Sequence, residues 1–313
     1  MNIEKTLFIG ISKNKIHIAT AANDEYMEAV VGLIKSAYRK SSNPSMIQFE
    51  VFLTTNQDST MIQNLQLTNE YLDNSWSIRL HLFDQNDVDI YVNRRWKGNN
   101  SQRHLKNANN YVRFILFKLL PDVDYCFWMD ADIAWNKDVI DFVMEKTRTD
   151  IELKKLKRSR EEQKREYGLP GKSFRTKFVA GAFPQDWMDI QWYAYKRLKK
   201  LNIHVQDKPS FNAGFVLLNL KLWRMKNIDK LIISIMKANN KFNILGGKLA
   251  SQPALTLACG GKNLFKFDTG AWRKALGVFP NVTISTDDVY ILHWNGEHKP
   301  WRADGFNKNL WMN

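Results

Sequence analysis

The chain has 313 residues, a length that suits one large α/β domain or two small ones. Hydrophobic residues make up 44% of the sequence and aromatic residues 12%, which excludes an intrinsically disordered protein because such a composition can build a packed core. The 46 Lys and Arg residues outnumber the 32 Asp and Glu residues, and the net charge of +14 favours acidic partners such as nucleotides, nucleic acid or an anionic membrane surface.

The sequence contains neither an evident signal segment nor an apolar run of the roughly 18 residues that a membrane-spanning helix requires. Its two cysteines, Cys126 and Cys259, lack the spacing of a metal site, and we expect both to be free, buried thiols. Free thiols suit a reducing compartment. We therefore expect a cytoplasmic protein that is soluble or peripherally membrane-associated.

The first part of the chain alternates strands with helices. Strands are predicted at 15–20, 47–53 and 76–83, a helix at 28–40 and a weaker helix at 59–70. Such alternation favours a Rossmann-like, mostly parallel central sheet flanked by helices. Ligands of these sheets bind beyond the carboxyl ends of the strands, so the residues that follow each apolar strand are the candidates for function.

The middle of the chain predicts a nearly all-apolar helix at 109–120, followed by an apolar strand at 125–129. Arg113 is an unexpected cation on that helix. It either extends its charged end to solvent or contacts a ligand. Further elements are predicted in the second half: a strand at 177–183, a helix at 186–200, a buried strand or strand pair at 211–220, a helix at 222–237 and a last strand at 289–294.

A strongly basic run extends from Lys154 to Lys177 and predicts an exposed helical insertion at about 147–177 within a single domain spanning 1–313. This run is either a solvated helix or a surface for an anionic acceptor or lipid headgroups. No nucleic acid partner is expected, because the charge is not accompanied by a recognised nucleic-acid motif.

Asp130 and Asp132 directly follow the apolar strand at 125–129. Side chains of a strand alternate, so both carboxylates leave the same face. Paired oxygen ligands suit Mn²⁺, or Mg²⁺ as the alternative, bound to a diphosphate. The sequence contains two other Asp-x-Asp pairs, beginning at Asp87 and Asp122, but neither follows an apolar strand in a strand–helix context. Solvated turn carboxylates are the competing interpretation.

His293 ends the last predicted strand and is followed by Gly296 and Lys299. An imidazole could complete the ligand set of a Mn²⁺ ion held by two Asp residues. Glycine permits a tight turn or close backbone approach, and lysine is a cation suited to phosphate. A histidine after a strand is also often structural, so the three residues are more informative together than singly.

Four segments of the chain resemble, in order, the family 8 glycosyltransferases, which include glycogenin, lipooligosaccharide galactosyltransferases and plant galacturonosyltransferases. The segments are ATAANDEY, YVRFILFKLLPDVDYCFWMDADI, FNAGFVLLNLKLWR and ILHWNGEHKPW. The resemblance implies a GT-A fold, a UDP-sugar donor, Mn²⁺ and sugar transfer with retention of the anomeric configuration.

Carried over position by position, the resemblance implies that Asp130, Asp132 and His293 are metal ligands and that Gly296 and Lys299 contact the diphosphate. The remaining implied donor contacts are Ala21, Ala22, Asn23, Asp24 and Tyr26 around the uridine, with Tyr26 stacked on uracil, together with Arg113, Ala131 and, beside the sugar, Asn212.

The chain departs from the family at two places. Asn23 stands where the family usually has an acid, although its amide oxygen could still accept a hydrogen bond from uracil. Where the family tends to show Asp-Gln-Asp, this chain has Ser251, Gln252 and Pro253. Gln252 is kept and both acids are absent, which leaves the identity of the sugar open.

The sequence therefore predicts a metal-dependent retaining hexosyl- or pentosyltransferase acting from a UDP-sugar on a hydroxyl of a glycan, glycolipid or glycoprotein. Asn212 and Gln252 would orient the sugar. The alternatives are a non-catalytic protein that binds a UDP-sugar or nucleic acid, a metal phosphohydrolase, and an inverting GT-A enzyme with Asp186, Asp189 or Asp268 as its base.

Overall fold

The structure is a computed structural model that describes residues 15–54, 77–92, 107–143, 179–184, 188–205, 210–245, 251–261, 264–267, 269–283 and 289–311. Within these ranges, the side chains of Asp24, residues 188–192, Phe265 and Thr269 are not described. The helix predicted at 59–70 and the basic insertion predicted at 147–177 lie outside the described residues.

The amino-terminal part of the chain forms the predicted strands and helix. Strand β1 (Ile16–Ala21) is followed by helix α1 (Met27–Lys40), strand β2 (Ile47–Thr54) and strand β3 (Ser77–Phe83). The apolar residues of α1 recur every three or four positions, so one face of the helix is buried. Strand β2 pairs in parallel with both β1 and β3.

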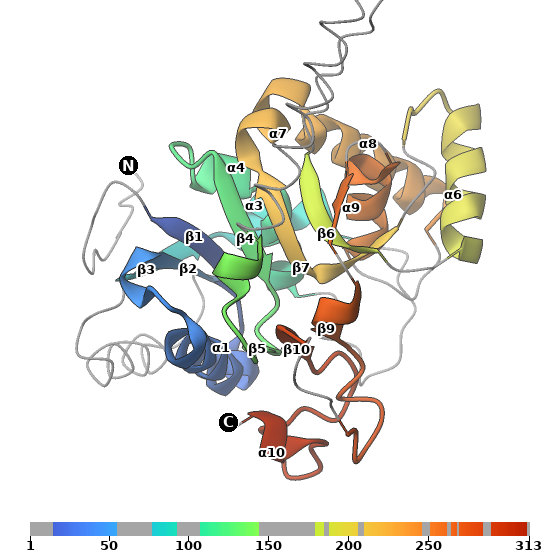
Figure 1. Ribbon diagram of the computed structural model, residues 1–313. Helices are drawn as coiled ribbons and strands as arrows, with labels where there is room; N and C mark the ends of the chain where they lie inside the picture. The colour runs from blue at the N-terminus through green and yellow to red at the C-terminus, as the bar shows by residue number, and fades with distance from the viewer. Residues whose placement is uncertain are drawn as a thin grey trace, which may run out of the picture.

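The main sheet has seven strands in the order β3-β2-β1-β4-β7-β6-β8 (Figure 1). Its remaining strands are β4 (Tyr125–Met129), β6 (Ala180–Pro184), β7 (Phe211–Asn219) and β8 (Leu264–Lys266). Strand β7 is a single strand and runs antiparallel to both β4 and β6, whereas the other pairs are parallel. The predicted mostly parallel sheet is therefore confirmed.

A small second sheet was not predicted from the sequence. It contains β5 (Ile133–Trp135), β10 (Ile291–His293) and β9 (Trp272–Arg273), in the order β5-β10-β9. Strand β10 pairs antiparallel with β5, and His293 lies opposite Ile133. The backbone N–H of Trp294 also donates to the carbonyl of Asp132 at 3.0 Å. This sheet joins β10, in the carboxyl-terminal part of the chain, to the residues that follow β4.

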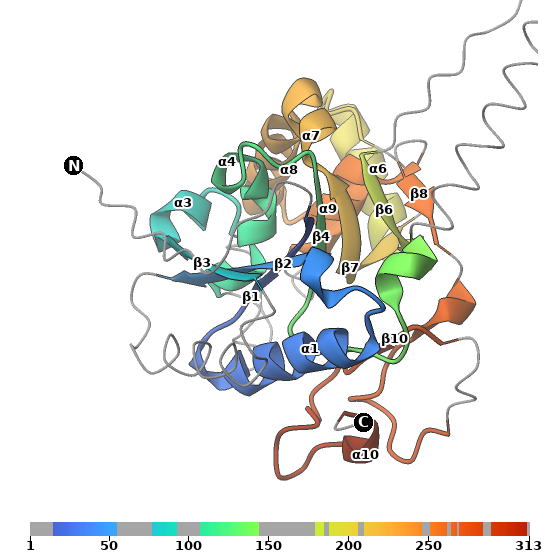
Figure 2. The same cartoon turned by 60° about the vertical axis from the view of Figure 1, so that its left-hand side comes forward.

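Helices cover both faces of the main sheet (Figures 1 and 2). Alternate residues of β4 face two separate hydrophobic clusters, with Trp128 in the cluster under α7, α8 and α9 and Phe127 in the cluster under α1. The other helices are α3 (Gln85–Asp89), α4 (Leu116–Leu119), α6 (Met188–Lys200), α7 (Leu220–Lys226), α8 (Ile228–Phe242), α9 (Gln252–Cys259) and α10 (Lys308–Trp311).

Two predicted helices have a different form in the structure. The segment predicted at 109–120 consists of two short 3₁₀ helices, η4 (Ala108–Asn110) and η5 (Val112–Phe114), followed by α4. Its side chains are apolar on nearly all sides, so most of the segment is buried in the core, and its backbone hydrogen bonds are mainly of the 3₁₀ type. The helix predicted at 222–237 is divided into α7 and α8 at Asn227, which adopts a left-handed φ of 50°.

Cys126 and Cys259 are both free and buried, as expected. Burial raises the pKa of both thiols, so they are poor nucleophiles. In the described part of the chain, none of the helices combines the length and apolar character needed to cross a membrane.

Candidate functional site

A cavity of about 330 Å³ contains the side chains that the sequence singled out. It is lined by Ala21, Ala22, Asn23, Tyr26, Asn107, Asn109, Asn110, Arg113, Trp128, Asp130, Ala131, Asp132, Asn212, Gln252, His293, Asn295, Gly296, Glu297 and Lys299. Each predicted site residue is among them except Asp24, whose side chain lies outside the described part. The cavity lies where β1 and β4 end and the antiparallel β7 begins, as expected for this class of sheet.

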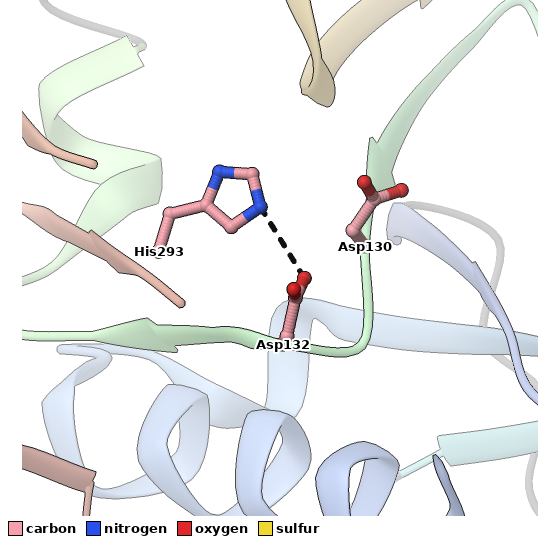
Figure 3. Close-up of side chains that lie close together, drawn as sticks. All are labelled: Asp130, Asp132 and His293. Carbon is pink, nitrogen blue, oxygen red and sulfur yellow. Dashed lines mark ion pairs between the residues drawn. The ribbon is translucent and has the colours of Figure 1, made fainter. Parts of the chain in front are cut away.

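Asp130, Asp132 and His293 converge on one point of the cavity (Figure 3). Each offers one ligand atom, and these atoms all lie within 4.8 Å of one another. Asp130 follows β4, Asp132 lies in the turn before β5, and His293 ends β10. The pairing of β5 with β10 is what brings the histidine to the two acids. Two carboxylates and an imidazole are a suitable donor set for Mn²⁺.

Asp132 is a buried carboxylate between two cationic or potentially cationic groups. Lys299 Nζ lies 2.5 Å from its Oδ2, and His293 Nε2 lies 3.3 Å from its Oδ1. Burial alone would raise the pKa of Asp132, but the charges and hydrogen bonds of Lys299 and His293 hold it well below its usual range. The lysine is held in place because it also donates to the carbonyl of Trp294 at 2.8 Å.

Asp130 is oriented through one of its oxygens. Its Oδ1 accepts from Arg113 Nη2 at 3.0 Å and from Trp128 Nε1 at 2.7 Å. The guanidinium of Arg113 also donates to the carbonyl of Ala213 at 2.6 Å and lies 4.5 Å from the centre of the Trp128 ring. Arg113 is only 4% exposed. The cation on the apolar segment therefore points into the cavity and not to solvent.

Two glycines provide space at the site. Gly214 on β7 lies against the ring of His293, and a Cβ built there would also come within 2.9 Å of Asn212 Oδ1. Gly296 has a φ of +128°, and a Cβ there would lie 2.6 Å from the backbone carbon of Gly277. Side chains at either position would move the groups that line the cavity.

Asn212 and Gln252 are fixed by the start of β7. The side-chain oxygen of Asn212 accepts from the backbone N–H of Gly214 at 2.7 Å, and that of Gln252 accepts from the backbone N–H of Ala213 at 3.0 Å. The amide nitrogen is therefore the remaining hydrogen-bonding group of Gln252. It is the group that this residue can offer to a ligand.

The loop after β1, which includes Asn23 and Tyr26, forms one wall of the cavity. The backbone N–H of Tyr26 donates to the carbonyl of Asn23 at 2.9 Å and closes a turn. The Tyr26 ring makes an edge-on contact with Trp301 at 5.4 Å between centres, and Lys299 Nζ lies 5.9 Å from it. Burial, followed by the charge of Asp132, raises the pKa of Tyr26, so the phenol stays neutral.

Six residues of the cavity were not predicted: Asn107, Asn109, Asn110, Trp128, Asn295 and Glu297. The run Asn-Ala-Asn-Asn before Arg113 was a usable signal, because three amides precede a segment that is otherwise apolar. Asn295 and Glu297 lie within the segment already singled out around Gly296. Asn295 accepts from the backbone N–H of Ala275 at 2.5 Å and so supports the neighbouring loop.

Comparison with known sequences identifies relatives along most of the chain. The family model described as glycosyl transferase family 8 matches residues 17–305. Glycosyltransferase 8 domain-containing protein 2 of Homo sapiens is 27% identical over 221 residues, which cover 67% of this chain and 59% of the human protein. Probable galacturonosyltransferase-like 2 of Arabidopsis thaliana is 23% identical over 296 residues, which cover 93% of this chain and 77% of the plant protein. The chain thus matches 59% of the length of the human relative.

Solved structures have the same arrangement of strands and helices. The galactosyltransferase LgtC, in complex with donor and acceptor sugar analogs, gives a TM-score of 0.59 at 16% identity, covering 95% of this chain and 94% of that one. The bifunctional glycosyltransferase WbbM gives a TM-score of 0.60 at 14% identity, covering 97% and 50%. At these identities the likeness establishes the fold alone. Together with the family match, it shows that the chain belongs to glycosyl transferase family 8 and has a GT-A fold.

Proposed function

We propose that this protein is a metal-dependent glycosyltransferase that moves a sugar from a UDP-sugar to an acceptor hydroxyl. The observation that carries the proposal is the convergence of Asp130, Asp132 and His293 within 4.8 Å, beside Lys299, in one cavity of a family 8 chain. The donor set fits Mn²⁺ because it combines carboxylate oxygens with an imidazole nitrogen. When bound, the metal would supply Lewis-acid stabilisation of a departing diphosphate.

The protein's own cations would share that task. Lys299 lies at the metal ligands and is oriented by the carbonyl of Trp294, so its ammonium would face a phosphate oxygen without reorganising. Arg113 keeps Asp130 in position through the bond to Oδ1. Leaving-group departure then needs no acid from the protein. Tyr26 would stack on the base, and Gln252 and Asn212 would orient the sugar.

The test of this proposal is donor turnover. The protein is incubated with Mn²⁺ and a panel of UDP-sugars, and released UDP is measured with and without excess EDTA. We expect slow hydrolysis of the correct donor, faster release once a suitable acceptor is present, and loss of both in EDTA. Full transfer in EDTA would exclude the metal. Binding of UDP without any turnover over the whole panel would support the non-catalytic alternative, which the missing acids beside Gln252 favour.

We also propose that the reaction retains the α configuration of the donor. The residues that flank Gln252, Ser251 and Pro253, offer no carboxylate to act as a base on the opposite face of the sugar. Asp186, Asp268 and the side chain of Asp189 lie outside what the structure describes. Proton NMR of the first-formed product tests the proposal, since a β-linked product would mean inversion and a carboxylate base.

Peripheral contact with an anionic membrane surface remains a proposal that rests on the net charge of +14. Sedimentation with anionic vesicles at low salt should carry the protein down, and neutral vesicles or high salt should release it. Binding that is indifferent to lipid charge would contradict the proposal.

A further inference from the structure

Trp311, on the short helix α10, packs against helix α1. Helix α10 lies on the side of α1 that faces away from the main sheet (Figures 1 and 2). Gly32 of α1 faces the Trp311 ring, and a Cβ built on this glycine would overlap the ring. Glycine in the middle of a helix is unfavourable relative to alanine. The room that Gly32 leaves for the tryptophan accounts for its presence in α1.

The Trp311 ring also contacts two tryptophans of the segment after β10. Its centre lies 5.1 Å from the centre of the Trp294 ring, which it meets edge-on, and 5.4 Å from the centre of the Trp301 ring. Trp294 is completely buried, and Trp301 and Trp311 are partly buried. In the sequence, Trp294 precedes Lys299 and Trp301 follows it. Trp311 therefore contacts this segment on both sides of the lysine.

Trp294 connects these contacts to Lys299 itself. Its backbone carbonyl accepts from Lys299 Nζ at 2.8 Å, and its backbone N–H donates to the carbonyl of Asp132 at 3.0 Å. Its indole Nε1 donates to the carbonyl of Phe306, just before α10, at 3.0 Å. Trp294 is thus held by the cavity residues through its backbone and by the segment around α10 through its ring. A shift of this ring would move the carbonyl that orients the lysine.

We propose that Trp311 is a positioning residue that holds the 294–301 segment on α1 and so keeps the Lys299 ammonium directed at the donor diphosphate. The side chain of lysine is long and flexible, so its ammonium has one position only where its acceptors are fixed. Without the Trp311 ring, Trp294 and Trp301 would each lose a packing partner, and the segment would lose its contact with Gly32. This inference rests on the proposed UDP-sugar donor and adds to it a residue of α10.

The test measures the affinity of the full chain for UDP in Mn²⁺ by calorimetry, in single variants and in a double-mutant cycle. Trp311→Leu removes the ring. Gly32→Ala keeps Trp311 but displaces it, and alanine is favourable inside a helix. Lys299→Met removes the ammonium and is combined with Trp311→Leu. Tyr193→Leu, which replaces an exposed aromatic ring on α6, is the control.

We expect Trp311→Leu and Gly32→Ala each to weaken UDP binding about tenfold, which corresponds to one misplaced hydrogen bond from a charged group. Lys299→Met should weaken it at least as much. In the Lys299→Met background, Trp311→Leu should cause less than about a twofold further loss, because the group that it positions is gone. Tyr193→Leu should bind UDP as the wild type does.

Two outcomes would overturn the inference. One is unchanged UDP affinity in Trp311→Leu. The other is a loss that is equally large in the Lys299→Met background, which would show that Trp311 acts through Tyr26 or through overall stability. The melting temperature of each variant without nucleotide checks its fold, and if Trp311→Leu does not fold, Gly32→Ala takes its place in the cycle. A wild type that binds no UDP in Mn²⁺ would instead refute the proposed donor.

Discussion

The carboxylate of Asp132 connects the metal-binding part of the cavity to its basic part. We predict that Asp132→Asn lowers transfer by about tenfold to thousandfold, because it removes a charged ligand and the buried partner of Lys299. The measurement is UDP release over a Mn²⁺ titration. Asp124→Asn is the matched control, since Asp124 ends another Asp-x-Asp pair but is exposed and pairs only with Lys221 and Arg224 among the described residues. Equal losses in the two variants would contradict the role of Asp132.

Gln252 offers its oxygen to the backbone and its nitrogen to the cavity. We predict that Gln252→Ala lowers the transfer rate by about 10- to 1000-fold while UDP affinity changes little, because the contact strengthens as charge develops on the sugar. Rates at saturating donor and calorimetry with UDP provide the two readouts. Gln252→Glu keeps an acceptor for the N–H of Ala213 and separates the structural role from the chemical one. Full activity in that variant would show that the amide nitrogen is not required.

Strand β7 contacts two of the candidate metal ligands, Asp130 and His293, through Gly214. We predict that Gly214→Ala weakens Mn²⁺-dependent UDP binding by about tenfold or more, because the new methyl group displaces the His293 ring while the strand pairing stays intact. Circular dichroism checks the fold, and calorimetry measures the binding. Gly181→Ala on β6 is the control, since its Cβ would contact Phe267 at 3.1 Å, away from the cavity residues. Unchanged binding in Gly214→Ala would mean that His293 can move without loss.

Strands β1, β2 and β3 are joined by a buried ionic cluster around Glu50. His17 Nδ1 and His81 Nε2 donate to its two oxygens at 2.7 Å and 2.5 Å, and Arg79 lies at 3.4 Å. Burial alone would raise the pKa of Glu50, but these hydrogen bonds and charges hold it below its usual value. The cluster compensates a fully buried carboxylate, so it links three neighbouring strands by more than backbone pairing.

We predict that Glu50→Gln lowers the free energy of unfolding by about 3 kcal/mol at neutral pH, because it removes the buried charge that pairs with Arg79 and accepts hydrogen bonds from His17 and His81. A depressed pKa in the folded state means that this contribution is present above about pH 4.3, the unfolded pKa, and is lost as the pH falls through the lower folded pKa. Urea unfolding at pH 7 and at successively lower pH should therefore show wild type and variant converging in acid. A constant difference between them would contradict this assignment.

Over the whole molecule, the cavity draws on segments from residue 21 to residue 299, so its ligands should stabilise the entire fold. We predict that Mn²⁺ and UDP together, at about 100 times the dissociation constant, add about 2.7 kcal/mol of stability and raise the melting temperature by a few degrees. Differential scanning fluorimetry with either component alone and with EDTA is the control. An equal shift in EDTA would show that UDP binds without the metal.

The main sheet could be predicted from the sequence, and so could many of the residues that line the cavity at the ends of its strands. The positions of β1, α1, β2 and β4 follow from apolar periodicity, which is local. The pairing of β5 with β10 was not predictable, because strands of three residues carry almost no periodic signal and their partners are far apart in the chain. The amides before Arg113 were missed because no local pattern in the sequence shows that they line the cavity together with Arg113.

The antiparallel pairing of β10 with β5 also has a consequence for synthesis on the ribosome. His293 and Lys299 are translated long after Asp130 and Asp132, when β1 to β4 have already left the exit tunnel. The proposed metal and diphosphate contacts therefore cannot form together until the segment after β10 has emerged. A chain that ended before Ile291 would keep Asp130 and Asp132 but lack His293 and Lys299, so it could not assemble the proposed metal and diphosphate site.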